Sequence, residues 1–375
     1  MLYFLHLGTV GFGGPIALAA RMEKDLVETR RWISREDYLE GLAFSQLSPG
    51  PLAAQLAMYI GWLKAGRAGA AVVSMAFVLP SFLMAVAVAT AYVSFGQLAW
   101  IQSLFYGIGA AVIAIITQGA WRLARKTIGR DVFLWSLFTV VAVTTVWTGS
   151  EIVWLFLLCG LVAILWRGRS RLTLKSPLSS LGVVPGWLLA GSQGAASAST
   201  IGSLALFFGK AGAFVFGSGL AIVPFLYGGV VTKFHWLTEQ QFVDAIAVAM
   251  ITPGPVVITA AFIGYLVAGF VGGTVAASAV FAPPFLIVIL AAPHYQRFAR
   301  NPQVKAFVQG VTSAAVGAIA GAAIILARRA LIDVPTAFIA LGTFACLLKL
   351  KTVPEPLLIG LAGLAGLSWK YFVPK

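Results

Sequence analysis

Two Pro-Gly-Pro triplets, residues 49–51 and 253–255, interrupt two of the most apolar stretches of the chain. Proline lacks a backbone N–H and clashes with the preceding helical turn, so each triplet predicts the end of one helix and the start of another. The free N–H groups at a helix start attract anions. Uncharged polar side chains that can donate hydrogen bonds to an oxyanion surround both triplets. They are Gln46, Ser48 and Gln55 beside the first triplet, and Thr252 and Thr259 beside the second.

Two glycine-rich stretches, GFGGP at residues 11–15 and VFGSG at residues 215–219, lie at matched places in the two halves of the chain, each in an expected first span. Glycine lets a backbone approach a ligand or a neighbouring helix closely. The alternative interpretation is that these glycines only pack helices together. The candidate anion-binding site joins these stretches to the triplets: Gly13, Gly14, Pro15, Pro49, Gly50, Pro51, Gly217, Ser218, Gly219, Pro253, Gly254 and Pro255.

Helix ends and hydroxyls alone cannot hold a dry dianion. One helix end contributes about 0.3–2 kcal/mol, whereas burial of an unpaired ion costs on the order of tens of kcal/mol in a dry medium. The site must therefore be hydrated, or a basic residue must contribute. The candidates are Arg21 and the matched pair His6 and Lys210. The alternative for Lys210 is that its long side chain reaches out of the membrane from the start of a span.

Two acidic residues, Glu40 and Asp244, each lie nine residues before the first proline of a triplet. An acid in the first turn of a helix ordinarily complements the helix dipole. The second hypothesis is that one of these two acids carries a coupling proton. No carboxylate lies in the middle of an apolar span, where cation and proton transporters usually place acids. This pattern favours an anion as the transported species.

The amino-acid composition indicates which kind of secondary structure positions these residues. The chain is 60% hydrophobic and only 10% charged, with a mean hydropathy of +0.93, and its apolar runs reach the ~20 residues of a spanning helix. We therefore predict an all-α polytopic membrane protein. The net charge of +14 fits basic loops on the cytoplasmic side. The basic residues occur in short loops, which argues against nucleic-acid binding.

The chain contains an internal duplication. At an offset of 204 residues, the glycines, prolines and Trp32 of the first half meet the same residue types in the second, including Trp236. We predict an N-terminal repeat over residues 1–166, a linker over 167–200 and a C-terminal repeat over 201–375. Basic residues fall in opposite loops of the two copies, which predicts inverted topology.

Loop charges also predict the path of the triplet segments. Residues 42–62 and 246–265 become re-entrant hairpins if the basic loops of the first half share one side. Each repeat then has about five spanning helices plus one broken or re-entrant hairpin. In the alternative, each triplet segment crosses the membrane fully and the linker supplies an extra span.

Enzymatic chemistry finds no support in the sequence. Three scattered histidines and two cysteines in apolar runs make no metal-binding spacing, and no nucleophile or phosphate-binding motif occurs. We therefore expect a protein that is not an enzyme, with no cofactor and no metal.

Several stretches together resemble one known family. FLHLGTVGFGGP, RRWIS, QLSPGP and FVLPSF in the first half, and GSGLAIVP, ITPGPVVIT and FAPPF in the second, are similar to the chromate ion transporter (CHR or ChrA) family in its long, two-domain form. The family motifs fall on Phe12 to Pro15, Gln46, residues 49–51 and residues 253–255. The chain departs from the family pattern at Ser218 and Met250, which bears on the substrate more than on the fold.

The resemblance implies a secondary transporter of a tetrahedral dianionic oxyanion, chromate, that exports it across the bacterial inner membrane and confers resistance. Alternating access would expose a site between the two triplet breaks. The alternatives are transport of sulfate or another oxyanion, and a passive anion channel. The expected partners are the oxyanion, the lipid bilayer and, as one option, a second copy of the chain in a homodimer.

Overall fold

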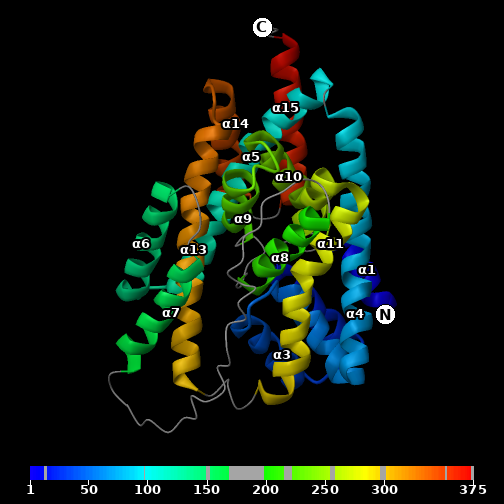
Figure 1. The fold of residues 1–375 in the computed structure, drawn as a ribbon, viewed down its shortest axis with the longest axis vertical. Coiled ribbons are helices and arrows are strands. Elements are labelled where there is room, and N and C mark those ends of the chain that lie inside the picture. The colour runs from blue at the N-terminus through cyan, green and yellow to red at the C-terminus, as the bar shows by residue number, and fades with distance from the viewer. Residues whose placement is uncertain are drawn as a thin grey trace.

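The computed structural model describes residues 1–11, 15–96, 98–148, 153–168, 198–214, 222–253, 258–295, 301–350 and 353–372. Every regular element within these ranges is a helix (Figure 1). Four helical stretches are long and apolar enough to cross a membrane: Leu52–Phe95, Ala99–Ile128, Thr259–His294 and Pro302–Ala330. Together with shorter apolar helices, they confirm the predicted all-α class and agree with a polytopic membrane protein.

The helices of the first half are α1 (Leu2–Val10), α2 (Pro15–Met22), η1 (Glu23–Thr29), α3 (Arg35–Leu47), α4 (Leu52–Phe95), α5 (Ala99–Ile128), α6 (Val132–Thr148) and α7 (Val153–Gly168). Those of the second half are α8 (Ala198–Phe214), α9 (Ile222–Leu226), η4 (Tyr227–Lys233), α10 (Glu239–Ile251), α11 (Thr259–Ala291), η6 (Ala292–His294), α13 (Pro302–Ala330), α14 (Val334–Lys349) and α15 (Glu355–Phe372).

The backbone of the second half repeats that of the first at the offsets found in the sequence. Both π-helices, η1 and η4, and both helices that precede the triplets, α3 and α10, begin and end at matched residues. Arg31 and His235, also matched, are the two non-glycine residues with positive φ in the described chain, each at 50°. Such a conformation is uncommon for residues with a side chain. Its recurrence shows that the two halves share local structure as well as sequence.

Each of the long helices α4 and α11 bends sharply near its start. In α4, Ala65 and Gly66 leave the helical region, with φ of −148° and 58°, and a Cβ on Gly61 would lie 2.8 Å from Val73 Cγ2. The matched Ala268 and Gly269 have φ of −145° and 62°. The chain therefore folds back at each bend, so that α4 consists of residues 52–64 and 67–95, and α11 of residues 259–267 and 270–291.

The first triplet connects two helices that fold against each other. Phe44 of α3 packs on Tyr59 of α4 with ring centroids 5.5 Å apart, and a Cβ on Gly41 would also collide with the Tyr59 ring. The helices before and after the triplet are therefore in contact with each other at positions several residues away from the triplet. This is the geometry of a hairpin, as expected for residues 42–62.

The helix expected at the start of the first half is interrupted at the glycine-rich stretch, because α1 ends at Val10 and α2 begins at Pro15. The Tyr3 hydroxyl donates to Asp25 Oδ2 at 3.1 Å, whereas 22 residues of straight helix would separate them by about 33 Å. In the second half, Phe207 stacks on Phe225 at 5.1 Å and packs on Trp236 at 5.8 Å. These ring and hydrogen-bond contacts fold α1 onto α2 and η1, and α8 onto α9 and η4. The predicted count of about five spans per half stays a prediction.

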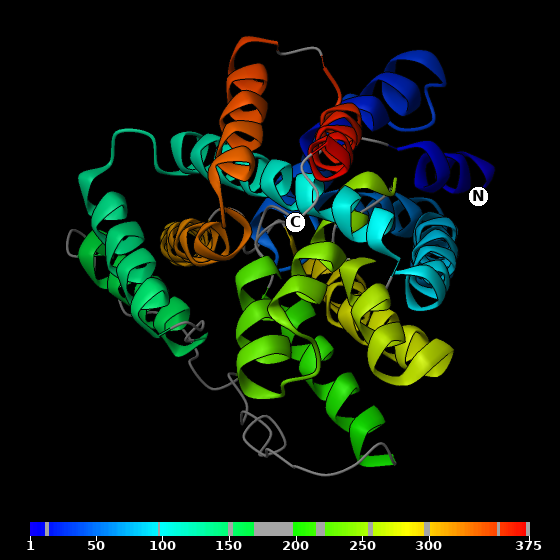
Figure 2. The same cartoon turned by 90° about the horizontal axis from the view of Figure 1, so that it is seen from above.

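The two halves interlock. Three contacts join α4 to α11 in antiparallel order: Phe82 with Phe270, Thr90 with Tyr265 and Tyr92 with Phe262. Figure 1 shows these two helices running in opposite directions. Viewed from above, α6 and α7 lie at the periphery against α13, a helix of the other half (Figure 2). In the same way, α14 and α15 pack on α5.

We predict that Gly8→Ala and Gly212→Ala each destabilise the protein. An added Cβ would meet the backbone carbonyl of Phe77 or Val280, respectively, and such overpacking typically costs about 1–3 kcal/mol. Thermal unfolding of the purified protein in detergent should show a lower Tm for both variants. Gly342→Ala is the control, because nothing lies within 4 Å of its Cβ position; an equal loss of Tm there would contradict the prediction.

Candidate functional site

The first triplet leaves the start of α4 uncapped. The helix α3 ends at Leu47, and Pro51 is the N-cap of α4 without a side-chain cap. The first intrahelical donor is the N–H of Gln55, which reaches Pro51 O at 2.9 Å. The donors of the preceding turn belong to Leu52, Ala53 and Ala54, all at most 6% exposed. A buried helix start of this kind offers backbone N–H groups to a ligand or to water.

Gln55 lies beside this helix start and is fully buried. Its Nε2 donates to Pro49 O at 2.6 Å. Its Oε1 is the only buried side-chain nitrogen or oxygen atom in the described chain that has no hydrogen-bond partner. Such an orphaned group costs about 1–3 kcal/mol. A water molecule or an oxyanion that carries a proton would satisfy this acceptor, so the break combines backbone donors with one side-chain acceptor.

Gly50 brings the two halves together at the break. Its φ of 141° lies in a region that residues with a side chain rarely adopt. A Cβ there would lie 2.6 Å from Gln55 Nε2 and 2.9 Å from the Pro284 Cβ of α11. Glycine is therefore required at this position, and the first break abuts the long helix of the second half.

The other predicted residues near the first break differ in exposure. Ser48 is buried, Pro15 is half-buried at the start of α2, and Gln46 is exposed. Gly13 and Gly14 lie outside the described residues. Of the predicted set, the structure thus brings Pro49, Gly50, Pro51 and Gln55 into one cluster.

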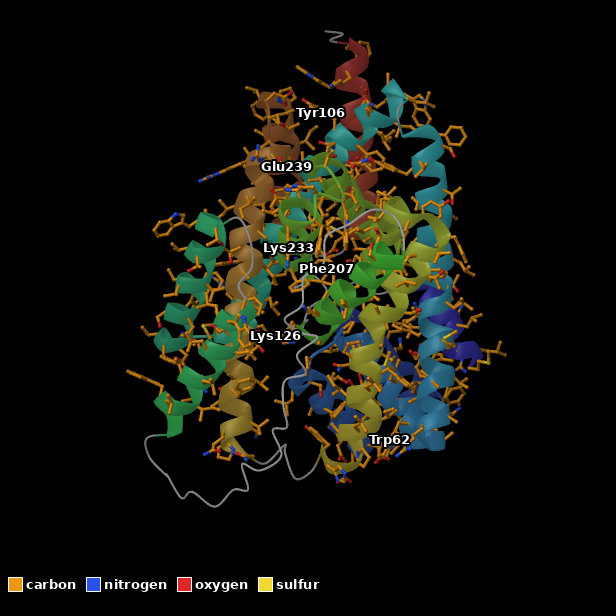
Figure 3. The ribbon with its side chains drawn as sticks, in the orientation of Figure 1. Trp62, Tyr106, Lys126, Phe207, Lys233 and Glu239 are labelled. Carbon is orange, nitrogen blue, oxygen red and sulfur yellow. The ribbon has the colours of Figure 1, made fainter. Side chains whose placement is uncertain are left out.

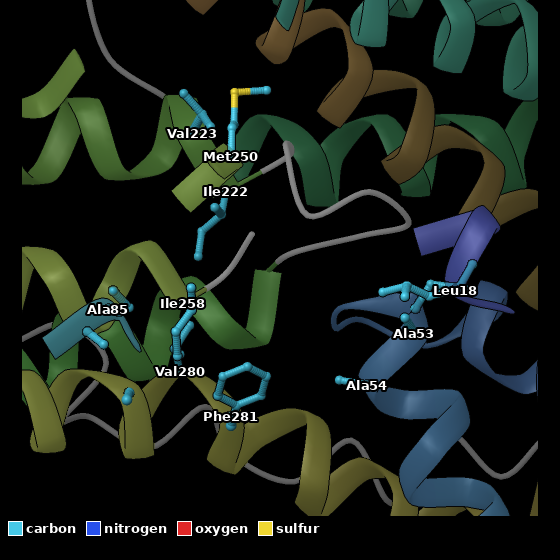
Figure 4. Close-up of a cluster of buried hydrophobic side chains, with 14 of the residues drawn as sticks. Leu18, Ala53, Ala54, Ala85, Ile222, Val223, Met250, Ile258, Val280 and Phe281 are labelled. Atoms are coloured by element: carbon cyan, nitrogen blue, oxygen red, sulfur yellow. The ribbon is translucent and has the colours of Figure 1, made fainter. Parts of the chain in front are cut away.

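The second break is more apolar than the first. Thr252 donates its hydroxyl hydrogen bond to Val248 O of its own helix at 3.0 Å, and Pro253 and Thr259 are buried. One residue fewer follows the triplet in the second half, and at the resulting offset of 203 residues, which aligns Gly66 with Gly269, Ile258 matches Gln55. Figure 4 shows Met250, Ile258 and Phe281 in one part of the apolar core and Leu18, Ala53 and Ala54 in another. Gly254, Pro255, Gly217, Ser218 and Gly219 lie outside the described residues.

The predicted basic candidates do not form a common cluster. His6 is exposed, and Lys210 is half-buried on α8. Arg21 is exposed and pairs with Asp25, with 3.8 Å between Nε and Oδ2. The donors established at the first break are therefore the backbone N–H groups of the helix start and Gln55 Nε2.

The expectation that Glu40 and Asp244 lie in first helical turns is wrong. The first-turn acids of α3 and α10 are Glu36, Asp37 and Glu239, because both helices begin one turn before the position assumed. Glu40 is half-buried, whereas Asp244 is only 4% exposed. The structure thus places a carboxylate deep inside an apolar segment, which the sequence analysis did not anticipate.

Two residues hold the Asp244 carboxylate, and sequence reasoning missed both. The Tyr92 hydroxyl donates to Oδ2 at 2.6 Å, and Gln240 Nε2 donates to Oδ1 at 3.0 Å. One signal in the sequence could have identified Tyr92. It matches Tyr295 at an offset of 203 residues, so each half has a tyrosine as well as an acid (Glu40 or Asp244) at matched positions.

Two cavities flank the start of α10, one of about 1000 Å³ and one of about 490 Å³. Both include Thr238, Gln241 and Arg329, and Asp244 lines the smaller one. Tyr106 of the smaller cavity and Glu239 of the larger are labelled in Figure 3. Neither of these two cavities is lined by the triplet residues, and the residues of the helix start at the first break, 52–54, are buried in this conformation. Within the described residues, no group of three His, Cys, Asp or Glu side chains could hold a metal ion.

We predict that Gly50→Ala is strongly destabilising and that shortening Gln55 restores part of the loss. The added Cβ collides with the Gln55 side chain, so the two sites should couple by about 1 kcal/mol or more, as contacting residues do. Thermal unfolding of Gly50→Ala, Gln55→Ala and the double variant measures this coupling. If the destabilisations of the two single variants simply add up in the double variant, the contact between residues 50 and 55 does not determine the stability of the break.

The chain is similar to known proteins over nearly its full length. The family described as "Chromate transporter" matches residues 1–164 and 202–367. The chromate transport protein of Cupriavidus metallidurans is 53% identical over 98% of this chain and 92% of its own length. A probable chromate transport protein of Synechococcus elongatus is 53% identical over 97% of this chain and 93% of its own length.

The chromate transport protein of Pseudomonas aeruginosa is 30% identical over 96% of this chain and 90% of its own length. No solved structure matches the chain. The matched family consists of transporters rather than enzymes, in agreement with the sequence analysis. From its helices, its duplicated breaks and these full-length similarities, the chain is a multi-pass membrane protein that belongs to the chromate transporter family.

Proposed function

We propose that the protein is a secondary transporter of chromate, a tetrahedral dianionic oxyanion, which binds at the first triplet break. The relatives that match nearly the full chain are named for chromate transport. The observation that carries the proposed site is the uncapped, buried start of α4 beside the unpartnered Oε1 of Gln55. Backbone N–H groups would bind the anion, and Gln55 would accept a hydrogen bond from bound water or from a protonated oxyanion.

Alternating access is proposed from the duplicated architecture. Matched helices α4 and α11 lie antiparallel, as inverted repeats require, and the triplet hairpins are proposed to be re-entrant. The repeats would span residues 1–166 and 201–375, joined by the linker 167–200. The bends at Gly66 and Gly269 would let each hairpin move against its long helix and open the buried break to one side of the membrane at a time.

The cellular setting follows from the same proposal. We place the protein in the bacterial inner membrane, where it would export chromate and so confer resistance. Its partners would be the oxyanion and the lipid bilayer, and a homodimer would be the assembly to test first. Sulfate has the same shape and charge as chromate and is the natural competitor.

Purified protein reconstituted in proteoliposomes tests the transport proposal. We expect uptake of labelled chromate by exchange against internal chromate, with competition by sulfate. Accumulation against a concentration gradient would distinguish a coupled transporter from a passive channel. Absence of both exchange and accumulation would refute the proposed function.

We predict that Gln55→Ile weakens chromate binding about tenfold, or about 1.4 kcal/mol. The variant copies the matched Ile258 of the second half and removes an unsatisfied acceptor. Gln118→Leu is the matched control, because Gln118 is also buried and, like Gln55, donates to a backbone carbonyl, Leu347 O, at 2.8 Å. It should lower Tm and leave chromate affinity unchanged. Equal affinity in Gln55→Ile and the parent protein would remove Gln55 from the site.

A further inference from the structure

A buried carboxylate lies where the two halves meet, away from the proposed anion site. Asp244 is 4% exposed, and its strongest contact comes from Tyr92 near the end of α4, in the other half of the chain. A hydrogen bond to a charged acceptor is roughly twice as strong as a neutral one. The charge state of this carboxylate therefore affects how firmly the two halves are held together.

No cation compensates this carboxylate in the described structure. The cations that share its cavity are engaged elsewhere: Arg329 Nε lies 3.1 Å from Glu239 Oε2, and Lys370 Nζ lies 5.0 Å from the ring centroid of Tyr106.

The elements packed against α10 contribute further titratable groups, and several of these groups have partners of their own. Tyr227 donates to Glu239, Tyr265 accepts from Thr90, Lys233 lies over Phe234, and Arg328 lines the larger cavity. Glu355 lies at the start of α15, also packed on α10. A buried carboxylate without a counter-ion is costly while it is charged, so proton uptake is the way in which this site relieves that cost.

Protons can reach the carboxylate through the smaller cavity. Its lining includes Gly96 at the end of α4, Gln102 and Tyr106 at the start of α5, and Lys370 at the end of α15. Of these residues, Tyr106 is labelled in Figure 3 and lies near the upper end of the molecule. The carboxylate is thus buried in protein on one side and borders an open space on the other.

The repeat provides a counterpart at the opposite end of the molecule. Glu40 matches Asp244 and Tyr295 matches Tyr92, and Tyr295 packs on Phe44 of α3 with ring centroids 5.5 Å apart. Among the described hydrogen bonds, none joins Glu40 to Tyr295, and Glu40 is half-buried. The hydrogen bond between Tyr92 and Asp244 is therefore formed, whereas the matched Tyr295 and Glu40 form none. This difference is expected of a transporter in one of its two access states.

We propose that Asp244 is the proton-binding residue that couples transport to a proton gradient, acting through its hydrogen bond from Tyr92. The charged carboxylate holds the end of α4 against α10. Uptake of one proton from cavity water neutralises it, weakens the Tyr92 contact and lets the halves separate at this end. The proton returns to water after the halves have moved. This inference rests on the proposed transport function and adds the residue responsible for coupling.

Proteoliposomes containing the parent protein, Asp244→Asn or Asp333→Asn test the proposal in two assays. Chromate exchange without a pH gradient reports transport itself, and chromate accumulation driven by a pH gradient reports coupling. The exchange rate of Asp244→Asn should stay within about twofold of that of the parent protein. Its gradient-driven accumulation should be at least tenfold lower. Asp333→Asn is the matched control, because Asp333 also accepts a tyrosine hydroxyl, from Tyr106 at 2.6 Å, but that contact is exposed. It should retain both activities.

A second variant keeps the test decisive if Asp244→Asn folds poorly. Tyr92→Phe retains the carboxylate but removes the donor that favours its charged form, so the pH profile of accumulation should move to higher pH. Gradient-driven accumulation that survives in Asp244→Asn, or an unchanged profile in Tyr92→Phe, would overturn the role of Asp244 and leave the transport function intact. Absence of exchange in the parent protein would overturn the transport function and this inference with it.

Discussion

The structure depends on the need to satisfy backbone polar groups without water. Hydrocarbon offers no hydrogen bonds, so a helix break at membrane depth must be enclosed by protein or must line a hydrated space. The chain meets this need by burying the first break between its halves, where Gly50 lies against Pro284. Helices α6 and α7 then pack on the opposite half. Both halves therefore contribute to the enclosure of the first break.

The same constraint separates two kinds of polar group in the fold. At the first break, backbone donors and Gln55 are close together and buried, so an anion bound there would complete hydrogen bonds that the protein leaves open, together with the hydration that a dianion needs. At Asp244, the carboxylate oxygens already have donors, and what is missing is a compensating charge. The first arrangement suits a ligand that brings its own oxygen atoms, and the second suits a proton. We propose that the two sites divide recognition and coupling between different helices.

Much of this fold could be predicted from the sequence, because glycine and proline act locally. The triplets, the bends and the duplication follow from residue types at fixed spacing, and the helix bounds of α3 and α10 repeat accordingly. Long-range contacts could not be predicted in this way. The hairpin of α1 depends on Tyr3 reaching Asp25, and the burial of Asp244 depends on Tyr92 from the other half. For the candidate site, the cluster around residues 49–51 and Gln55 was predictable, whereas the pairing of Arg21 with Asp25 was not.

The mismatch between Gln55 and Ile258 has a thermodynamic consequence. In the proposed cycle, two identical inverted halves would make the inward-facing and outward-facing forms equivalent by a two-fold rotation, with equal free energy, and the empty carrier would populate both equally. In this chain an isoleucine stands at the position that matches an amide, and a half-buried glutamate stands at the position that matches a buried aspartate, so the two forms would differ in free energy. The resting orientation of the proposed carrier would then depend on the few positions at which the duplicated halves have diverged.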